Sequence, residues 1–268
     1  MIGNKILKRK YALVTGACIN TGVAIVEKFL SEGYGVVFTG RNSEKVSEAE
    51  QSYKEKYSGC EVYGYAVDSL LDDRTVDEGA LDALFAELDE KGIFIECLVL
   101  NAADQGLGMK VFENPLTDFM RVINTNVVWN YAFSERAALR MKKNGGGNIV
   151  FINSNTAYRA IPDRIAYEAS KGGQLGMMRG LALDLGKYNI RVNAILPGMI
   201  RTDRWVKNPD FYKDVPSRFT PLGDVADGSD VADAVWYFAS AARNTTGAEL
   251  TLDGGNTIQL YPIIPKDL

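Results

Sequence analysis

YALVTGACINTG, residues 11–22, is an apolar run that enters a glycine-rich turn and opens a helical pattern from about Thr21 to Glu32. A turn of this kind between strand and helix lets backbone N–H groups and the positive end of the helix approach a pyrophosphate. The spacing is TGxxxGxG, except that Asn20 stands where the middle glycine is expected. Asparagine tolerates left-handed backbone better than most residues, so we expect the turn to survive, with the Asn20 side chain close to the phosphates or the ribose.

Six more apolar runs follow, and amphipathic stretches separate them. They are VVFTG (36–40), EVYGYAV (61–67), IECLVL (95–100), NIVFI (148–152), IRVNAIL (190–196) and AELTL (248–252). Strands that are apolar throughout and are joined by helices predict a parallel sheet buried on both faces. We therefore expect an α/β protein with a Rossmann-like, doubly wound fold, in which a seven-stranded parallel sheet is flanked by helices in a single domain over residues 1–268. Such sheets bind ligands at the carboxyl ends of their strands.

The composition excludes several kinds of chemistry. The chain has 268 residues, 30 Lys and Arg against 34 Asp and Glu, a formal net charge of −4, and no histidine. Without histidine it cannot form a Ser-His-Asp or Cys-His catalytic group or an HExxH zinc site. We expect no metal, and proton transfer must use Tyr, Lys, Cys or carboxylates. An ionisation between about pH 6 and 9 would then belong to Tyr167, a thiol or the amino terminus.

The same totals limit the partners. A mildly acidic chain offers no basic surface for nucleic acid, and no run approaches the ~18 apolar residues that indicate a membrane span. Cys18, Cys60 and Cys97 form neither a disulfide framework nor a CxxC metal motif, and we expect them to be buried thiols. We expect a cytoplasmic protein that binds a small molecule and neither nucleic acid nor a membrane.

Small and polar residues after the early strands predict a cofactor site. Arg41 follows Gly40 at the end of the second strand, where a carboxylate would bind the ribose hydroxyls of NAD and a cation favours the 2′-phosphate of NADP. Arg41 therefore favours NADP(H), with NAD(H) possible. Asp68 can accept a hydrogen bond from the adenine amino group, or it can be a simple turn residue. The candidate cofactor residues here are Gly16, Asn20, Thr21, Gly22, Arg41, Asp68, Ser69, Asn101 and Ala102.

The candidate catalytic residues lie in the middle of the chain. Tyr167 and Lys171 are four residues apart in a predicted helix, so both side chains emerge on one face. Ser154 follows the strand NIVFI, at a carboxyl end where ligands bind, and Asn126 lies in the long helix that ends near Lys143. The spacing YxxxK alone is common by chance, and an exposed helical pair is its usual explanation.

In this order and spacing, the four residues and the glycine-rich turn resemble the short-chain dehydrogenase/reductase family over about residues 10–256. The resemblance implies the reversible interconversion of a secondary alcohol and a ketone, with Tyr167 as the acid and base. It implies that the Lys171 ammonium lowers the pKa of Tyr167, that Ser154 holds the substrate oxygen, and that Asn126 anchors a water that links Lys171 to solvent. The further cofactor residues that it implies are Tyr167, Lys171, Pro197, Gly198, Ile200 and Thr202.

Residues 199–227 are polar-aromatic and weakly periodic, which is typical of a loop that covers a substrate. The predicted substrate contacts are Ser154, Thr156, Tyr158, Tyr167, Trp205 and Phe211. Their aromatic character favours a steroid or another ring-containing ketone. A sugar or polyol, a 3-oxoacyl substrate, and a cofactor-binding scaffold without catalysis stay as alternatives, whereas enoyl reductases have a longer Tyr–Lys spacing. The apolar tail at 256–268 predicts an interface and a homotetramer or homodimer.

Overall fold

The computed structural model describes residues 9–260, and its centre is one parallel sheet of seven strands in the order β3-β2-β1-β4-β5-β6-β7. The strands are β1 (Tyr11–Val14), β2 (Gly35–Gly40), β3 (Val62–Ala66), β4 (Ile95–Leu100), β5 (Gly147–Ile152), β6 (Ile190–Pro197) and β7 (Glu249–Leu252). All pairings between neighbouring strands are parallel. The seven predicted strands and the doubly wound α/β fold are therefore confirmed.

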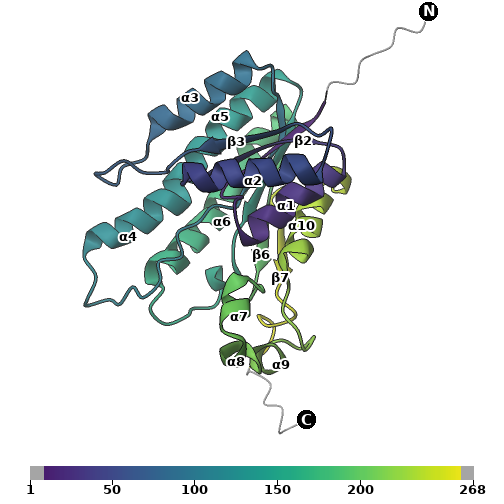
Figure 1. Ribbon diagram of the computed structural model, residues 1–268. Helices are drawn as coiled ribbons and strands as arrows, with labels where there is room; N and C mark the ends of the chain where they lie inside the picture. The colour runs from purple at the N-terminus through teal and green to yellow at the C-terminus, as the bar shows by residue number, and fades with distance from the viewer. Residues whose placement is uncertain (1–8, 261–268) are drawn as a thin grey trace, which may run out of the picture.

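Helices cover both faces of the sheet (Figure 1). They are α1 (Asn20–Ser31), α2 (Ser43–Lys56), α3 (Glu78–Glu90), α4 (Leu116–Ile123), α5 (Trp129–Lys143), α6 (Ile165–Leu185), α7 (Asp203–Lys207), α8 (Pro209–Tyr212), α9 (Val215–Phe219) and α10 (Gly228–Trp236). One core packs α3, α5 and α6 against the sheet, and the other packs α1, α2 and α10. Side chains alternate along a strand, so Leu13 of β1 enters the first core while Ala12 and Val14 enter the second.

The predicted long helix before β5 contains a π-helical turn. Residues Asn124–Val128 form this turn between α4 and α5, and it carries Asn126, whose side chain is fully buried. Single π-turns within helices occur frequently at functional sites, because the extra residue displaces side chains and carbonyls from their regular positions.

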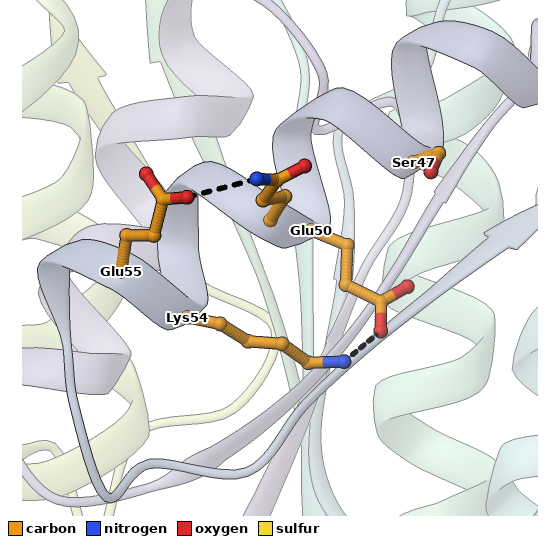
Figure 2. A pocket seen from close by; sticks show the side chains of 5 residues that line it. Ser47, Glu50, Lys54 and Glu55 are labelled. Atoms are coloured by element: carbon orange, nitrogen blue, oxygen red, sulfur yellow. Dashed lines mark hydrogen bonds and ion pairs between the residues drawn. The ribbon is translucent and has the colours of Figure 1, made fainter.

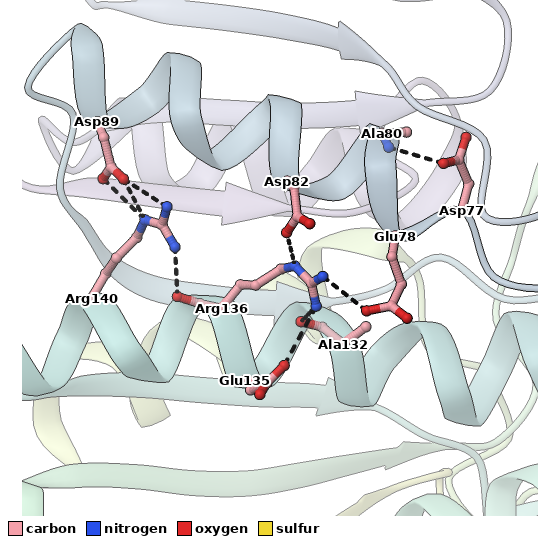
Figure 3. A network of polar contacts seen from close by, with 9 residues as sticks. All are labelled: Asp77, Glu78, Ala80, Asp82, Asp89, Ala132, Glu135, Arg136 and Arg140. Carbon is pink, nitrogen blue, oxygen red and sulfur yellow. Dashed lines mark hydrogen bonds and ion pairs between the residues drawn. The ribbon is translucent and has the colours of Figure 1, made fainter.

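Ion pairs fix α5 against α3 (Figure 3). Arg136 lies 2.6 Å from Asp82 and 3.0 Å from Glu78, and Arg140 lies 2.6 Å from Asp89. The carboxylates are largely exposed, so water screens each pair and its contribution to stability is small. The pairs orient the helix whose first residue directly follows the π-turn.

The sheet reverses its strand order beside β1, because β2 lies on one side of β1 and β4 on the other. Ligands of doubly wound sheets bind at this reversal, at the carboxyl ends of the strands. The loops after β1, β4, β5 and β6 therefore supply the candidate site.

The predicted covering loop at 199–227 contains three short helices, α7, α8 and α9, which lie together beyond the carboxyl ends of β6 and β7 (Figure 1). Pro209 and Pro216 stand in the first turns of α8 and α9, where proline is favoured. Helices of four or five residues are too short to give a helical period in the sequence. Among residues 9–260, no helix has the length and apolar character needed to cross a bilayer.

Candidate active site

The glycine-rich turn after β1 is fastened to the end of β4. Asn101 donates from Nδ2 to the carbonyl oxygens of Thr15, at 2.9 Å, and Gly16, at 3.0 Å. Thr15 Oγ1 accepts hydrogen bonds of 3.0 Å from the backbone N–H groups of Asn101 and Ala102. A Cβ on Gly16, whose φ is +66°, would lie 2.9 Å from Ala102 Cα. Asn101 and Ala102 thus shape the turn in addition to being candidate cofactor contacts.

Asn20 adopts the predicted left-handed backbone, with φ of 50°. Its Oδ1 accepts a 3.1 Å hydrogen bond from the backbone N–H of Asp203, the first residue of α7. The side chain expected near the phosphates or the ribose therefore joins the turn to the covering segment. Thr21 and Gly22 follow in the first turn of α1, and a Cβ on Gly22 would lie 2.5 Å from the Gly16 carbonyl oxygen.

Arg41 lies at the end of β2, exposed, and makes no hydrogen bond or ion pair within residues 9–260. Two further guanidinium groups lie nearby. Burial, then Arg74, then Arg41 lower the pKa of Arg121. Arg121 is paired with Asp104, and Arg74 lies 2.9 Å from Asp118, so Arg41 is the uncommitted cation of these three arginines.

Asp68 and Ser69 follow β3. Asp68 Oδ1 accepts a 2.7 Å hydrogen bond from the backbone N–H of Ser69, as expected of a turn residue. The Ser69 hydroxyl is buried and lies 3.5 Å from that of Thr125, in the π-turn. This contact connects the end of β3 with the segment that carries Asn126.

Ser154, after β5, is buried and has a fixed hydroxyl orientation. Its Oγ accepts hydrogen bonds from the backbone N–H of Thr156, at 3.1 Å, and from Thr156 Oγ1, at 2.9 Å. With both acceptor positions used, the Ser154 proton remains available to another oxygen. Thr156, a predicted substrate contact, therefore orients Ser154.

Tyr167 and Lys171 occupy one face of α6, as the spacing predicts, and Lys171 Nζ lies 5.5 Å from the centre of the Tyr167 ring. Burial raises the pKa of Tyr167, while a hydrogen bond to Ser154 and the charge of Arg164 lower it. The Arg164 guanidinium lies 5.8 Å from the ring centre. In the protein alone the expected lowering of the Tyr167 pKa by Lys171 is therefore not found, because burial outweighs the opposing effects.

Lys171 is 1% exposed, and its Nζ donates to the Ile152 carbonyl oxygen at 2.9 Å and to Gln174 Oε1 at 3.2 Å. Burial lowers the pKa of Lys171 to about 7. Lys171 must therefore be added to the groups that can ionise between about pH 6 and 9. Of the expected thiols only Cys97 is buried, with its pKa raised to about 12 by burial, while Cys18 and Cys60 are half-buried.

Asn126 is held from both sides. Its Oδ1 accepts a 2.7 Å hydrogen bond from the Asp104 N–H, and its Nδ2 donates to the Asp104 carbonyl oxygen at 2.8 Å and to Ser170 Oγ at 2.9 Å. Its own carbonyl oxygen accepts a 2.7 Å hydrogen bond from Gln174 Nε2. The Gln174 carboxamide thus lies between the Asn126 carbonyl oxygen and Lys171 Nζ.

The end of β6 and the segment after it complete the cofactor side. Pro197 ends β6, and a Cβ on Gly198 would lie 2.6 Å from Asp253 Cβ. Ile200 forms a bridge with Ala226, and Thr202 precedes the first turn of α7. The structure therefore places these predicted residues at the carboxyl end of the sheet.

The predicted substrate residues separate into two groups. Trp205 stacks on Tyr212, with ring centres 4.4 Å apart, beside a hollow of about 230 Å³ in the covering segment. The Tyr158 hydroxyl donates instead to Glu249 of β7, which also pairs with Arg179, and no hydrogen bond joins Tyr158 to Ser154 or Tyr167. The side chain of Phe211 lies outside what the structure describes.

Comparison with known proteins agrees with this geometry. Residues 16–257 match the family model described as enoyl-(acyl carrier protein) reductase. The chain is 33% identical over 251 residues to a 3α-hydroxysteroid dehydrogenase of Mediterraneibacter gnavus, covering 92% of this chain and 97% of that protein. This chain belongs to the short-chain dehydrogenase/reductase family. As a member of it, the protein is an NAD(P)-dependent oxidoreductase that acts on CH–OH groups.

Two solved structures of short-chain dehydrogenases/reductases have the same fold. L-sorbose reductase from Gluconobacter frateurii, complexed with NADPH and L-sorbose, superimposes with a TM-score of 0.84 at 27% identity, over 94% of this chain and 98% of that one. A 7α-hydroxysteroid dehydrogenase complexed with NADH and 7-oxo glycochenodeoxycholic acid gives 0.81 at 30% identity, over 94% and 95%. The two proteins bind different cofactors and unrelated substrates.

A hollow of about 400 Å³ on α2 lies away from this short-chain dehydrogenase/reductase site (Figure 2). Its side chains satisfy one another: Lys54 pairs with Glu50, and Gln51 donates to Glu55 at 2.9 Å. These are interactions of residues four apart on a solvated helix surface. The hollow carries none of the residues that the family uses.

Two side chains next to the catalytic group were not predicted from the sequence, Arg164 and Gln174. Gln174 follows Lys171 by three residues in α6, so the two side chains share a helix face, whereas Arg164 is the residue just before α6.

Proposed function

We propose that this protein interconverts a secondary alcohol and a ketone with NADP(H), using Tyr167 as acid and base. The observation that carries the proposal is the oriented Ser154 hydroxyl, which accepts two hydrogen bonds and so keeps its proton available to an oxygen beside Tyr167. A free proton on Ser154 and a tyrosine hydroxyl beside it are the donors that a carbonyl oxygen needs as it becomes an alkoxide.

The residues present fit a nicotinamide dinucleotide. The turn after β1 has the left-handed backbone at Gly16 and Asn20 that directs N–H groups toward a pyrophosphate, and α1 begins at Asn20. Gly16, Asn20, Thr21 and Gly22 would hold the phosphates, and Arg41 would hold the adenosine end. When bound, the cofactor supplies or accepts the hydride.

In reduction, Ser154 donates to the substrate oxygen and Tyr167 transfers its proton to that oxygen. The charge left on Tyr167 is stabilised by Arg164, whose guanidinium lies 5.8 Å from the ring centre. Asn126 acts as a support, because its side chain fixes the backbone of Asp104 and the hydroxyl of Ser170, which in turn donates to the Tyr167 carbonyl oxygen.

The preference for NADP(H) over NAD(H) rests on Arg41, an exposed cation without a partner among the described residues. A 2′-phosphate provides the charge-assisted hydrogen bonds that this guanidinium lacks. The NADPH bound to L-sorbose reductase and the NADH bound to the 7α-hydroxysteroid dehydrogenase leave both cofactors within the family's range.

We propose a steroid or another ring-containing ketone as the substrate, with a sugar or polyol as the second candidate. The stacked rings of Trp205 and Tyr212 support an apolar ring, as does the hydroxysteroid relative. The likeness to L-sorbose reductase supports the sugar. The spacing of Tyr167 and Lys171 favours either over enoyl reduction.

The deciding experiment measures absorbance of NADPH and NADH with steroids, keto-sugars and acyl ketones. We expect turnover with NADPH and a ring-containing ketone. Tyr167→Phe should abolish turnover while NADPH still binds, and retention of most activity by this variant would contradict the mechanism. An inactive wild-type protein that binds NADPH would instead indicate a cofactor-binding scaffold.

We also propose a cytoplasmic homotetramer, with a homodimer as the alternative. The free thiols Cys18, Cys60 and Cys97 suit a reducing compartment. Exposed apolar side chains on α5 and α6, among them Tyr131, Leu139 and Leu183, suit contact with other copies.

Most of the apolar tail, residues 261–268, lies outside the described residues. Sedimentation as a monomer at micromolar concentration would contradict the assembly, and cell fractionation tests the compartment.

A further inference from the structure

Gln174 is a glutamine inside the catalytic framework, 1% exposed on α6. Its Nε2 donates to the Asn126 carbonyl oxygen at 2.7 Å. Its Oε1 accepts from Lys171 Nζ at 3.2 Å and from Asn153 Nδ2 at 3.1 Å. One carboxamide thus joins three segments: the π-turn, the end of β5 and the catalytic face of α6.

The orientation of this carboxamide follows from its neighbours. An ammonium group only donates hydrogen bonds, and a backbone carbonyl oxygen only accepts them. Gln174 must therefore turn its oxygen toward Lys171 and its nitrogen toward Asn126. The reverse orientation would set the –NH2 group against the Lys171 ammonium and leave the Asn126 carbonyl oxygen facing a second acceptor.

We propose that Gln174 is a positioning residue, which links Lys171 to the Asn126 carbonyl oxygen through its carboxamide, fixes the direction of the ammonium and stabilises its protonated form. Its relevance to turnover rests on the proposed function. Lys171 Nζ has two hydrogen-bond acceptors, the Ile152 carbonyl oxygen and Gln174 Oε1, so Gln174 accepts one of the two hydrogen bonds that compensate the buried charge.

Of the two hydrogen bonds that Lys171 Nζ donates, only the one to Gln174 can be removed by a substitution, because the other goes to a backbone carbonyl oxygen. From α6 Lys171 faces the Tyr167 ring, from β5 the Ile152 carbonyl oxygen, and from the π-turn Asn126 through Gln174. No ion pair involves Lys171 within residues 9–260, and burial is the cause that lowers its pKa. With no carboxylate to compensate it, loss of the Gln174 acceptor should lower this pKa further.

A carboxamide also differs from a water molecule in its ability to transfer protons. Water in this position would accept one proton and release another, whereas an amide N–H does not release its proton in neutral solution. Gln174 itself therefore relays no proton, and its hydrogen bonds to Lys171 and Asn126 serve position and charge alone.

The test titrates Lys171 in the protein without cofactor or substrate, by NMR of lysine labelled with ¹³C at Cε. The Lys171 signal is assigned by its loss in Lys171→Met. We expect Gln174→Met, which keeps the length of the side chain but removes its three hydrogen bonds, to lower the Lys171 midpoint by about one pH unit. Gln51→Met makes the same change on the outer face of α2 and should leave the midpoint unchanged.

An unchanged Lys171 midpoint in a folded Gln174→Met protein, judged by circular dichroism, would overturn the proposal. Should that variant fail to fold, Gln174→Glu replaces it, because it keeps the shape and adds a negative charge. It should raise the midpoint by at least one pH unit, and no change there would overturn the proposal equally. Since the titration needs no reaction, failure here would leave the Tyr167→Phe test of the function intact.

Discussion

Asn20, in the turn after β1, accepts a hydrogen bond from the backbone N–H of Asp203, which lies 183 residues later in the chain. Asp203 is the first residue of α7, and no side chain within α7 or next to it caps this helix end. Asn20 thus does for α7 what an N-cap side chain does in other helices. The cofactor turn and the covering segment are connected through this contact.

We expect Asn20→Gly to loosen α7 with little effect on the free energy of unfolding. The variant loses an exposed hydrogen bond, worth about 0.5–1.5 kcal/mol, but glycine adopts the φ of 50° without the cost that a side chain brings. Limited trypsin digestion should cleave faster after Arg204 and Lys207. Asn189→Gly, at another left-handed position before β6, is the matched control and should not change cleavage there. Equal cleavage of Asn20→Gly and the wild type would refute the connection.

Arg41→Ala should weaken NADPH binding about 10- to 100-fold and leave NADH binding nearly unchanged. The reason is that a guanidinium–phosphate interaction contributes about 1.5–3 kcal/mol and NADH lacks the phosphate. Fluorescence titration with both cofactors measures this. Arg243→Ala, at an exposed position before β7, serves as the control. An equal loss for NADPH and NADH would show that Arg41 acts on something both cofactors share.

Thr156→Val should lower kcat about tenfold without changing NADPH affinity. Valine matches threonine in shape but cannot donate to Ser154 Oγ, so the Ser154 proton loses its fixed direction; about 1.4 kcal/mol of transition-state stabilisation corresponds to this factor. Thr156→Ser retains the hydroxyl and should keep most of the activity. Steady-state rates with whichever ketone the screen identifies provide the measurement, and equal rates for the valine and serine variants would exclude the role.

The sequence predicted the strands better than the helices that surround the site. Continuous apolar runs such as IECLVL indicate buried parallel strands without ambiguity, because both faces of each strand enter a core. The π-turn at Asn124–Val128 was not predictable, since one extra residue within a helix changes the local period and leaves no pattern of its own. The helices α7, α8 and α9 contain too few residues to show a period.

Within the site, the sequence identified the reacting groups but not the side chains that position them. Ser154, Tyr167 and Lys171 have a spacing that a reaction requires. No sequence pattern distinguishes Gln174, because a glutamine in a helix is usually solvated. Only the tertiary structure shows that this glutamine is buried. The pKa of Tyr167 was misjudged for the same reason: sequence places the Lys171 cation near it but does not give the burial of either group.

Burial of Lys171 should also make protein stability depend on pH. Its pKa falls from 10.5 in the unfolded chain to about 7 in the folded protein. Between these two pH values the unfolded state binds more protons than the folded state. Buried Lys171 therefore destabilises the folded protein most below about pH 7. As the pH rises toward 10.5 this destabilisation decreases, by at most about 1.4 kcal/mol per pH unit. Lys171→Met removes this pH-dependent contribution, so the wild type should gain stability with rising pH and the variant should not. Measured by urea titration, the free energy of unfolding of Lys171→Met relative to wild type should therefore fall by about 2 kcal/mol from pH 7 to pH 9. Lys45→Met, at an exposed lysine, should show no such change, and a difference between Lys171→Met and wild type that stays constant over this range would mean that Lys171 remains protonated in the folded protein.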